Sequence, residues 1–137
     1  MSISDPIADA LTKVRNAYRA GHKQVSVNHC NLVESVMKIL AKENFINNFD
    51  IVDRDPERKI YRKQILVNLR YTNDGKPVLR GLDRVSRPGR RIYVKAMNIP
   101  SVFNNTGCAI ISTSQGVFTD RDARANKAGG EYVCKVW

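Results

Sequence analysis

The sequence lacks the features that define membrane proteins, disulfide-rich secreted proteins and zinc-stabilised proteins. No stretch approaches the roughly 18 to 20 uncharged apolar residues of a membrane-spanning helix, and the first residues do not resemble a secretory signal. The cysteines Cys30, Cys108 and Cys134 are widely spaced, and no C-x-x-C pair occurs. We therefore expect a cytoplasmic globular protein whose thiols are reduced and serve mainly as core filler.

Signatures of catalysis, metal binding and cofactor binding are also missing. His22, His29 and Cys30 lie close in sequence but lack a fourth ligand at a usable zinc spacing. Neither of the two glycine-rich patterns that cradle phosphates occurs. Ser35 and Lys38 match S-x-x-K, but the companion motifs of that hydrolase class are absent, and the intervening residues fit a helix core. The sequence therefore favours a protein that is not an enzyme and needs no metal or cofactor.

Acidic residues are scarce, and this is the strongest compositional feature of the chain. The sequence holds 23 Lys and Arg against 13 Asp and Glu, which gives a formal net charge of +10. Residues 1–68 contain 11 basic and 8 acidic side chains, whereas residues 69–137 contain 12 and 5. Such an excess indicates a polyanionic partner that binds mainly to the second half of the chain.

The first part of the chain predicts an α-β-α-β-β order. Asp5 and Pro6 form a helix start signal, apolar residues follow at helical spacing, and Gly21 ends the segment. Residues 31–34 resemble a capping box at the start of a second helix. The expected elements are helices at 6–20 and from 31 to about 43–44, and strands at 25–27, 45–52 and 60–71. The polar segment 72–77 ends this N-terminal α/β subdomain, which spans residues 1–72.

The remainder, residues 78–137, predicts a mainly β subdomain with short helices. Two candidate strands flank Pro88-Gly89, and an apolar strand at 109–112 leads into the segment STSQG. The final residues, EYVCKVW, alternate as a last strand. Two short helices are expected, one around 100–105 and one capped by Thr119 with Asp122 and ending at Gly129-Gly130.

A basic run in the second subdomain is the first candidate site. Its cations are opposed only by Asp83 and are interleaved with Tyr93. They are Arg80, Arg84, Arg87, Arg90, Arg91 and Lys95. Guanidinium groups bind phosphate oxygens through two hydrogen bonds, and an exposed aromatic ring can stack on an unpaired base. The run favours a nucleic-acid partner, with a solvated charged surface as the alternative and a buried core position as the alternative for Tyr93.

The segment STSQG is the second candidate site. Hydroxyl groups of Ser112, Thr113 and Ser114 can bind base edges and ribose 2′-hydroxyls, and Gly116 lets a backbone approach the ribose-phosphate chain closely. The alternative is a plain turn at the end of a strand, before the helix that Thr119 caps. Spacing alone does not decide between these interpretations.

Four motifs together resemble one family, that of the eighth protein of the small ribosomal subunit in its bacterial form. They are DPIADALTKVRNA, SRPGRRIYVKAMNIP, GCAIISTSQGVFTDRDAR and GGEYVCKVW. Both halves of the chain contribute in order, and the similarity is weaker between Gly21 and Lys76. The combination of STS-x-G-V-x-T-D with a terminal GGE strand is highly specific for this family.

The resemblance implies an α+β protein of two apposed small subdomains that binds the central domain of small-subunit rRNA. It would organise early assembly as a structural protein without catalysis. Ser112, Thr113, Ser114 and Gly116 would enter the RNA minor groove, Tyr93 would stack, and Glu131 would lie beside the loop. The complete expected RNA-binding set is Ser112, Thr113, Ser114, Gln115, Gly116, Tyr93, Arg87, Arg90, Arg91, Lys95 and Glu131.

Two further expectations and one departure accompany the resemblance. The implied partners include neighbouring small-subunit proteins and, as in many family members, an operon mRNA that imitates the rRNA site. Gln115 stands where the family commonly has Lys, which removes one charge directed at phosphate. A free-standing cytoplasmic RNA chaperone or regulator is the alternative function.

Overall fold

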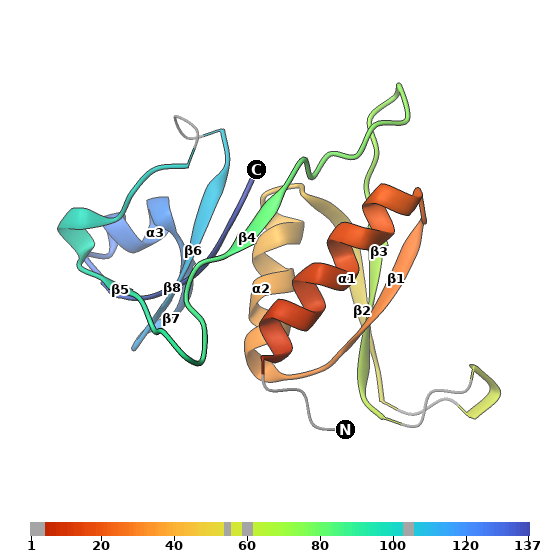
Figure 1. The fold of residues 1–137 in the computed structure, drawn as a ribbon, viewed down its shortest axis with the longest axis horizontal. Helices are drawn as coiled ribbons and strands as arrows, with labels where there is room; N and C mark the ends of the chain where they lie inside the picture. Colours follow the sequence, from red (N-terminus) through yellow and green to blue (C-terminus); the bar gives the residue numbers. More distant parts are fainter. Residues whose placement is uncertain (1–4, 54–55, 59–61, 103–105) are drawn as a thin grey trace. The chain divides into compact units, whose positions relative to one another are not determined.

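The computed structural model describes residues 5–53, 56–58, 62–102 and 106–137 (Figure 1). The chain divides into two compact units, Met1–Leu79 and Arg80–Trp137. Within the described residues, three α-helices and two antiparallel sheets confirm the predicted α+β class. None of the helices in this part of the chain is long and apolar enough to cross a membrane.

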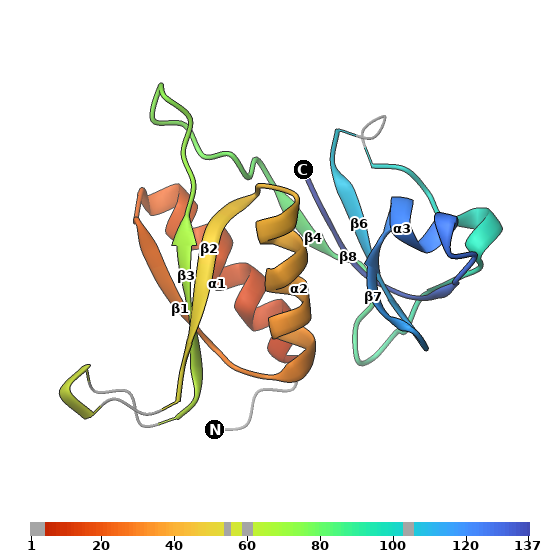
Figure 2. The same cartoon turned by 180° about the vertical axis from the view of Figure 1, so that it is seen from behind.

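The N-terminal unit has the predicted α-β-α-β-β order. Its elements are α1 (Pro6–Ala20), β1 (Gln24–Asn28), α2 (Asn31–Lys42), β2 (Ile46–Val52), the 3-10 helix η1 (Pro56–Arg58) and β3 (Gln64–Leu69). The strands pair in the order β1-β3-β2 (Figures 1 and 2). Ile65, Val67 and Leu69 alternate along the central strand β3 and are buried. The apolar stripes of both helices complete this core, as their periodicity predicted.

The caps of α1 are confirmed, but the predicted cap of α2 is wrong. The Asp5 side chain accepts a hydrogen bond from the Ala8 amide at 3.2 Å, and Gly21 ends α1 with φ of 75°. At α2 the cap is Cys30, whose sulfur accepts from the Val33 amide at 3.5 Å, and Asn31 is already helical. Glu34 does not close a capping box, because its carboxylate lies 3.1 Å from His29 Nε2.

The strand predicted at 60–71 is shorter in the structure. Among the described residues it spans Gln64–Leu69, while positions 60 and 61 lie outside them. Tyr71 has left the strand: its hydroxyl donates to the His22 carbonyl, and its backbone forms an isolated bridge with Pro77. The tertiary contact with the turn after α1 therefore overrides the alternation of apolar residues that predicted a longer strand.

The C-terminal unit is mainly β, as predicted. Its elements are β4 (Leu82–Arg84), β5 (Tyr93–Val94), the 3-10 helix η2 (Ala96–Asn98), β6 (Cys108–Thr113), β7 (Gly116–Thr119), α3 (Asp120–Ala125) and β8 (Gly130–Val136). The strands run in the order β4-β8-β6-β7, and β5 also pairs with β8. One face of this sheet packs Ile111 and Tyr132 against Ala123 of α3. β8, which is last in sequence, is therefore the strand that joins β4, β5 and β6.

Both short helices predicted in this unit need correction. The described part of 100–105 is not helical, and η2 lies upstream instead. η2 ends before Pro100, because a proline disfavours the helical region for the preceding residue. Ile99 is accordingly extended, with φ of −69° and ψ of 117°. Thr119 does cap α3, accepting from the Asp122 amide at 3.2 Å. However, α3 ends at Ala125, before Gly129-Gly130, and Lys127 adopts a positive φ of 51°.

The cysteines are free thiols with mainly structural positions. Cys108 and Cys134 are buried in the C-terminal unit, and Cys30 is partly exposed as the cap of α2. Burial raises the pKa of Cys134 to about 12, so this thiol stays protonated and unreactive at neutral pH. The prediction of core filler therefore holds for two of the three cysteines.

Candidate functional site

The STSQG segment forms the tip of the β6–β7 hairpin. Thr113 pairs with Gly116 across the turn, and the side chains of Ser114 and Gln115 are exposed between them. The Thr113 hydroxyl donates to the Gly116 carbonyl at 2.8 Å and accepts from the Gln115 amide at 3.1 Å. Thr113 therefore holds the turn together, while Ser114 presents its hydroxyl to solvent.

Gly116 is required by its backbone conformation and not by crowding. Its φ is 136°, in a region that side-chain-bearing residues rarely adopt. A Cβ built at this position would meet no atom within 4 Å. The open space around Gly116 leaves room for a ligand to approach the hairpin backbone.

Three segments far apart in sequence meet in one row on the sheet. Glu131 of β8 is paired with Tyr93 of β5 on one side and with Ser112 of β6 on the other. Directly opposed residues on antiparallel strands share a face, so these side chains are neighbours. Tyr93 is 69% exposed, so its alternative role as a core residue is wrong. The row Tyr93–Glu131–Ser112 thus leads towards the hairpin tip at residues 112–116. It lies on the outer face of the sheet, opposite the face that packs Ile111 and Tyr132 against α3.

Glu131 is the anionic centre of this face. Its Oε1 accepts hydrogen bonds from Ser86 Oγ at 2.7 Å and from Arg91 Nη1 at 2.8 Å. Burial disfavours the charged form of Glu131, but these two bonds and the charges of Arg91 and Arg84 outweigh it and lower the pKa of Glu131. The carboxylate is therefore ionised at neutral pH.

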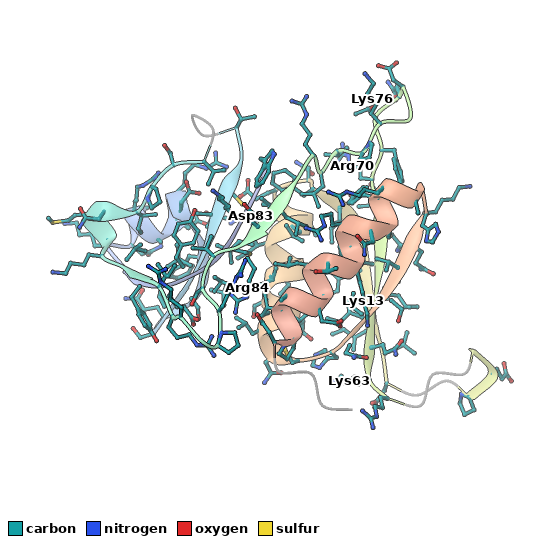
Figure 3. All side chains as sticks on the ribbon, in the orientation of Figure 1. Lys13, Lys63, Arg70, Lys76, Asp83 and Arg84 are labelled. Atoms are coloured by element: carbon teal, nitrogen blue, oxygen red, sulfur yellow. The ribbon has the colours of Figure 1, made fainter. Side chains whose placement is uncertain are left out.

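The arginine run does not form one uniform cationic surface. Arg87 and Arg90 flank a tight turn closed by two backbone hydrogen bonds of 3.1 and 2.9 Å, and both side chains are exposed. Arg91 is directed to Glu131, and Lys95 is exposed after β5. Arg84, labelled on β4 in Figure 3, is half-buried and donates to the Val133 carbonyl at 2.6 Å. Arg84 therefore supports the sheet, which its sequence spacing could not reveal.

Gly129 and Gly130 allow β8 to enter the sheet. A Cβ on Gly129 would lie 2.6 Å from the Val94 carbonyl oxygen, and one on Gly130 would collide with the Ser112 carbonyl oxygen. The glycine pair therefore lets the chain pass between β5 and β6 and places Glu131 at its position in the row. The sequence indicated these glycines as the end of a helix and as part of the GGE motif, but not the close approach of neighbouring strands that requires them.

Glu131→Gln is expected to destabilise the protein by about 1 kcal/mol at neutral pH, because a charge-assisted acceptor becomes neutral. The folded pKa of Glu131 is lowered, so its carboxylate contributes stability above the ordinary glutamate pKa, and this contribution is lost as pH falls through the folded pKa. Thermal unfolding of both proteins from pH 7 to acid should show the difference shrinking below about pH 4.3. A difference that is constant with pH would contradict this assignment.

Comparison with known proteins supports the resemblance over both units. Residues 5–137 match the family described as Ribosomal protein S8. The chain is 48% identical over 137 residues to the small ribosomal subunit protein uS8 of Limosilactobacillus reuteri (strain DSM 20016), covering 100% of each. The corresponding protein of Chlamydia abortus is 46% identical over 134 residues, covering 98% of this chain and 97% of the relative. That of Rubrobacter xylanophilus is 40% identical over 137 residues, covering 100% of each.

Ribosomal proteins of this family are structural components of the ribosome and not enzymes, which confirms the expectation from the missing catalytic motifs. The family match begins at Asp5, where the helix cap of α1 forms, and extends through the hairpin tip and the GGE strand to the last residue. Because this match covers nearly the whole chain, the protein belongs to the ribosomal protein S8 family.

Proposed function

We propose that this protein is a structural constituent of the small ribosomal subunit that binds the central domain of small-subunit rRNA directly and organises its assembly. The observation that carries the proposal is the outer face of the C-terminal sheet, where Tyr93, Glu131 and Ser112 form a row beside the exposed hairpin tip. We call this surface the RNA face. It consists of residues 93, 131 and 112–116 together with the cations Arg87, Arg90, Arg91 and Lys95.

Different residues of the RNA face bind different groups of the RNA. Ser114 offers a hydroxyl that can donate to or accept from base edges and 2′-hydroxyls, and Gly116 leaves the backbone beside it open. The exposed ring of Tyr93 provides a surface on which an unpaired base can stack. Exposed guanidinium groups of Arg87 and Arg90 neutralise phosphates. The hairpin tip supplies selectivity, and the cations supply attraction to any RNA.

The same face would serve the other proposed partners. An operon mRNA that imitates the rRNA site would bind there in competition with rRNA, and neighbouring small-subunit proteins would contact the surfaces that RNA leaves free. The protein would then reside on cytoplasmic ribosomes. Gln115, exposed at the turn, contributes no charge to phosphate binding in this chain.

Footprinting of the purified protein on its own small-subunit rRNA tests the proposal directly. Protection should map to one structured region of the central domain and should persist in the presence of excess unrelated duplex. A free-standing RNA chaperone would instead protect many sites weakly and would be displaced by unrelated duplex of the same length. Equal affinity for the two RNAs would favour that alternative.

Binding is expected to be strongly salt dependent, because the cations of the RNA face release counterions from phosphates. Neutralising Arg87 and Arg90 together should lower the salt-dependence slope by about 2 and weaken specific and unrelated RNA alike. The matched control is the double variant Lys13→Gln/Lys38→Gln, since these lysines are paired with Asp9 and Glu34 in the N-terminal unit. Titrations at several salt concentrations should leave the control slope nearly unchanged, and equal slopes for both variants would refute the assignment.

Tyr93→Ala is expected to weaken rRNA binding by about 5- to 100-fold, because base stacking on an aromatic ring contributes roughly 1–3 kcal/mol. The free energy of unfolding should change little, since the ring is 69% exposed. Tyr93→Phe keeps the stacking surface and should retain most of the affinity. Calorimetric unfolding and binding measured on the same samples check this, and an unfolded Ala variant would show that the ring has a structural role.

A further inference from the structure

Ser86 is a completely buried polar residue that lies directly behind the RNA face. Its hydroxyl donates to Glu131 Oε1 at 2.7 Å and accepts from the Ile92 amide at 3.1 Å. A serine hydroxyl has one hydrogen, so its donor capacity is committed to Glu131. Ser86 therefore links β8 to the segment that leads into β5.

The backbone around Ser86 is fixed by further hydrogen bonds. The Ser86 amide donates to the Tyr132 carbonyl at 3.0 Å, and the Tyr132 amide donates to the Ile92 carbonyl at 2.9 Å. Ser86 and Ile92 enclose the turn that carries Arg87 and Arg90, and Ile92 immediately precedes Tyr93. The position of the Glu131 carboxylate is thus tied to the elements that carry the stacking ring and the exposed arginines.

The Glu131 carboxylate has one committed and one available oxygen. Oε1 accepts from both Ser86 and Arg91, whereas no group among the described residues donates to Oε2. The side chain is 19% exposed, in the middle of the row between Tyr93 and Ser112. An ionised carboxylate only accepts hydrogen bonds, and it repels a phosphate. The Glu131 carboxylate, at the centre of an otherwise cationic face, can therefore accept a hydrogen bond from a donor group of the RNA. It repels the phosphates of the RNA backbone.

We propose that Ser86 is a positioning residue that holds Glu131 as the acceptor for one hydrogen-bond donor of the RNA, a base amino group or a ribose 2′-hydroxyl. The inference rests on the proposed function, because it assigns a ligand group to one position of the RNA face. Glu131 then determines specificity in two ways: it binds the donor of the correct RNA, and it disfavours RNAs that would place a phosphate there.

Glu131→Gln tests the charge of the acceptor while keeping its shape, so Ser86 can still donate to the side-chain oxygen. Affinity for the specific rRNA fragment should fall by about 5- to 30-fold, because a charge-assisted hydrogen bond is weakened. Affinity for an unrelated duplex should rise by about 2- to 10-fold at low salt, because a like charge no longer opposes phosphate. A parallel fall for both RNAs would overturn the specificity role.

Ser86→Ala tests the positioning role. The variant should lose about 5- to 30-fold in specific affinity without a change in the salt-dependence slope, since no cation is removed. Ser86→Thr retains the hydroxyl and should recover affinity to within about 3-fold of the unmodified protein. The matched control is Ser35→Ala, which removes a hydroxyl bonded to the Asn31 carbonyl in α2 and should bind normally. Equal losses for the Ala and Thr variants would overturn the positioning role.

Single-nucleotide substitutions in the rRNA fragment identify the hydrogen-bond donor that Glu131 binds. They also distinguish this contact from a purely structural role of Glu131, which would show no coupling to one RNA group. Single 2′-deoxy substitutions and guanosine-to-inosine substitutions remove one donor at a time. At least one should weaken binding of the unmodified protein by 5-fold or more, on the order of one lost hydrogen bond, yet have little effect on Glu131→Gln. If no substitution shows this coupling, the acceptor assignment is wrong. If the unmodified protein does not prefer the fragment over the duplex, the proposed function itself fails.

Discussion

Gly130→Ala should destabilise the protein by about 2–3 kcal/mol, because the added methyl group would collide with the backbone of the neighbouring strand. A Cβ at this position would overlap the Ser112 carbonyl oxygen and lie 3.0 Å from the Thr113 Cα. Backbone atoms inside a paired sheet cannot move aside as the end of a flexible side chain can. The strain must therefore separate β8 from β6, just where Glu131 pairs with Ser112.

Gly89→Ala is the matched control for this substitution. Gly89 lies in the exposed turn between Arg87 and Arg90 and has no positive φ, and a Cβ added to it would meet no atom within 4 Å. Its replacement should change the free energy of unfolding by less than about 0.5 kcal/mol, as is usual at open surface positions. Chemical denaturation of both variants measures the difference, and coincident unfolding curves would show that the close approach at Gly130 is unimportant.

Ser114→Ala should reduce affinity for the specific rRNA by about 5- to 100-fold, because a hydrogen bond lost to a buried partner typically costs roughly 1–3 kcal/mol. Ser114 is exposed in the free protein and makes no hydrogen bond within the described residues, so its removal should leave the stability of the fold unchanged. An unrelated duplex should bind as before, since the cations remain. Competition between the rRNA fragment and a length-matched duplex measures both effects.

Two neighbouring substitutions separate recognition from the structure of the turn. Ser112→Ala should cost less binding than Ser114→Ala, because Ser112 lies within the paired part of β6 and is only partly exposed. Gly116→Val should impair binding without changing charge, since a β-branched residue is strained at a φ of 136° and fills the open space beside the backbone. If Ser114→Ala lowered the affinity for both RNAs equally, or for neither, the hairpin tip would have only a structural role. Other residues would then recognise the RNA.

Predictions from local sequence signals held best where the structure depends on neighbouring residues. The cap at Asp5, the stop at Gly21 and the cap at Thr119 each involve groups within a few positions of one another, and all three are present. Prediction failed where another partner competed. The capping-box pattern predicts that Glu34 bonds back to the helix start, but His29 and Lys38 hold its carboxylate instead.

The candidate site was predictable in its composition and not in its arrangement. The sequence indicated the hydroxyl-rich segment STSQG, Tyr93 and the arginine run, because residue types of this kind suit RNA contacts wherever they occur. It did not predict the strand β7 after this segment, which makes it the tip of a hairpin. It did not indicate that Arg84 would bind the backbone of β8 or that Ser86 would matter. Nothing in the local pattern distinguishes Ser86 from any other serine, since its partner Glu131 is 45 residues away in sequence.

By itself the sequence determined the family, the order of the elements in the N-terminal unit, the excess of positive charge and the residues able to meet RNA. These properties depend on residue identity and on spacing over a few positions. Tertiary structure alone decided which arginines reach solvent, why Gly129 and Gly130 are needed, and how the Glu131 carboxylate is held between Tyr93 and Ser112. The position of Arg84, the need for the two glycines and the place of Glu131 all depend on β8 pairing with β4, β5 and β6. Such long-range pairing is set by packing and strand register across the whole unit, which no short stretch of the chain contains.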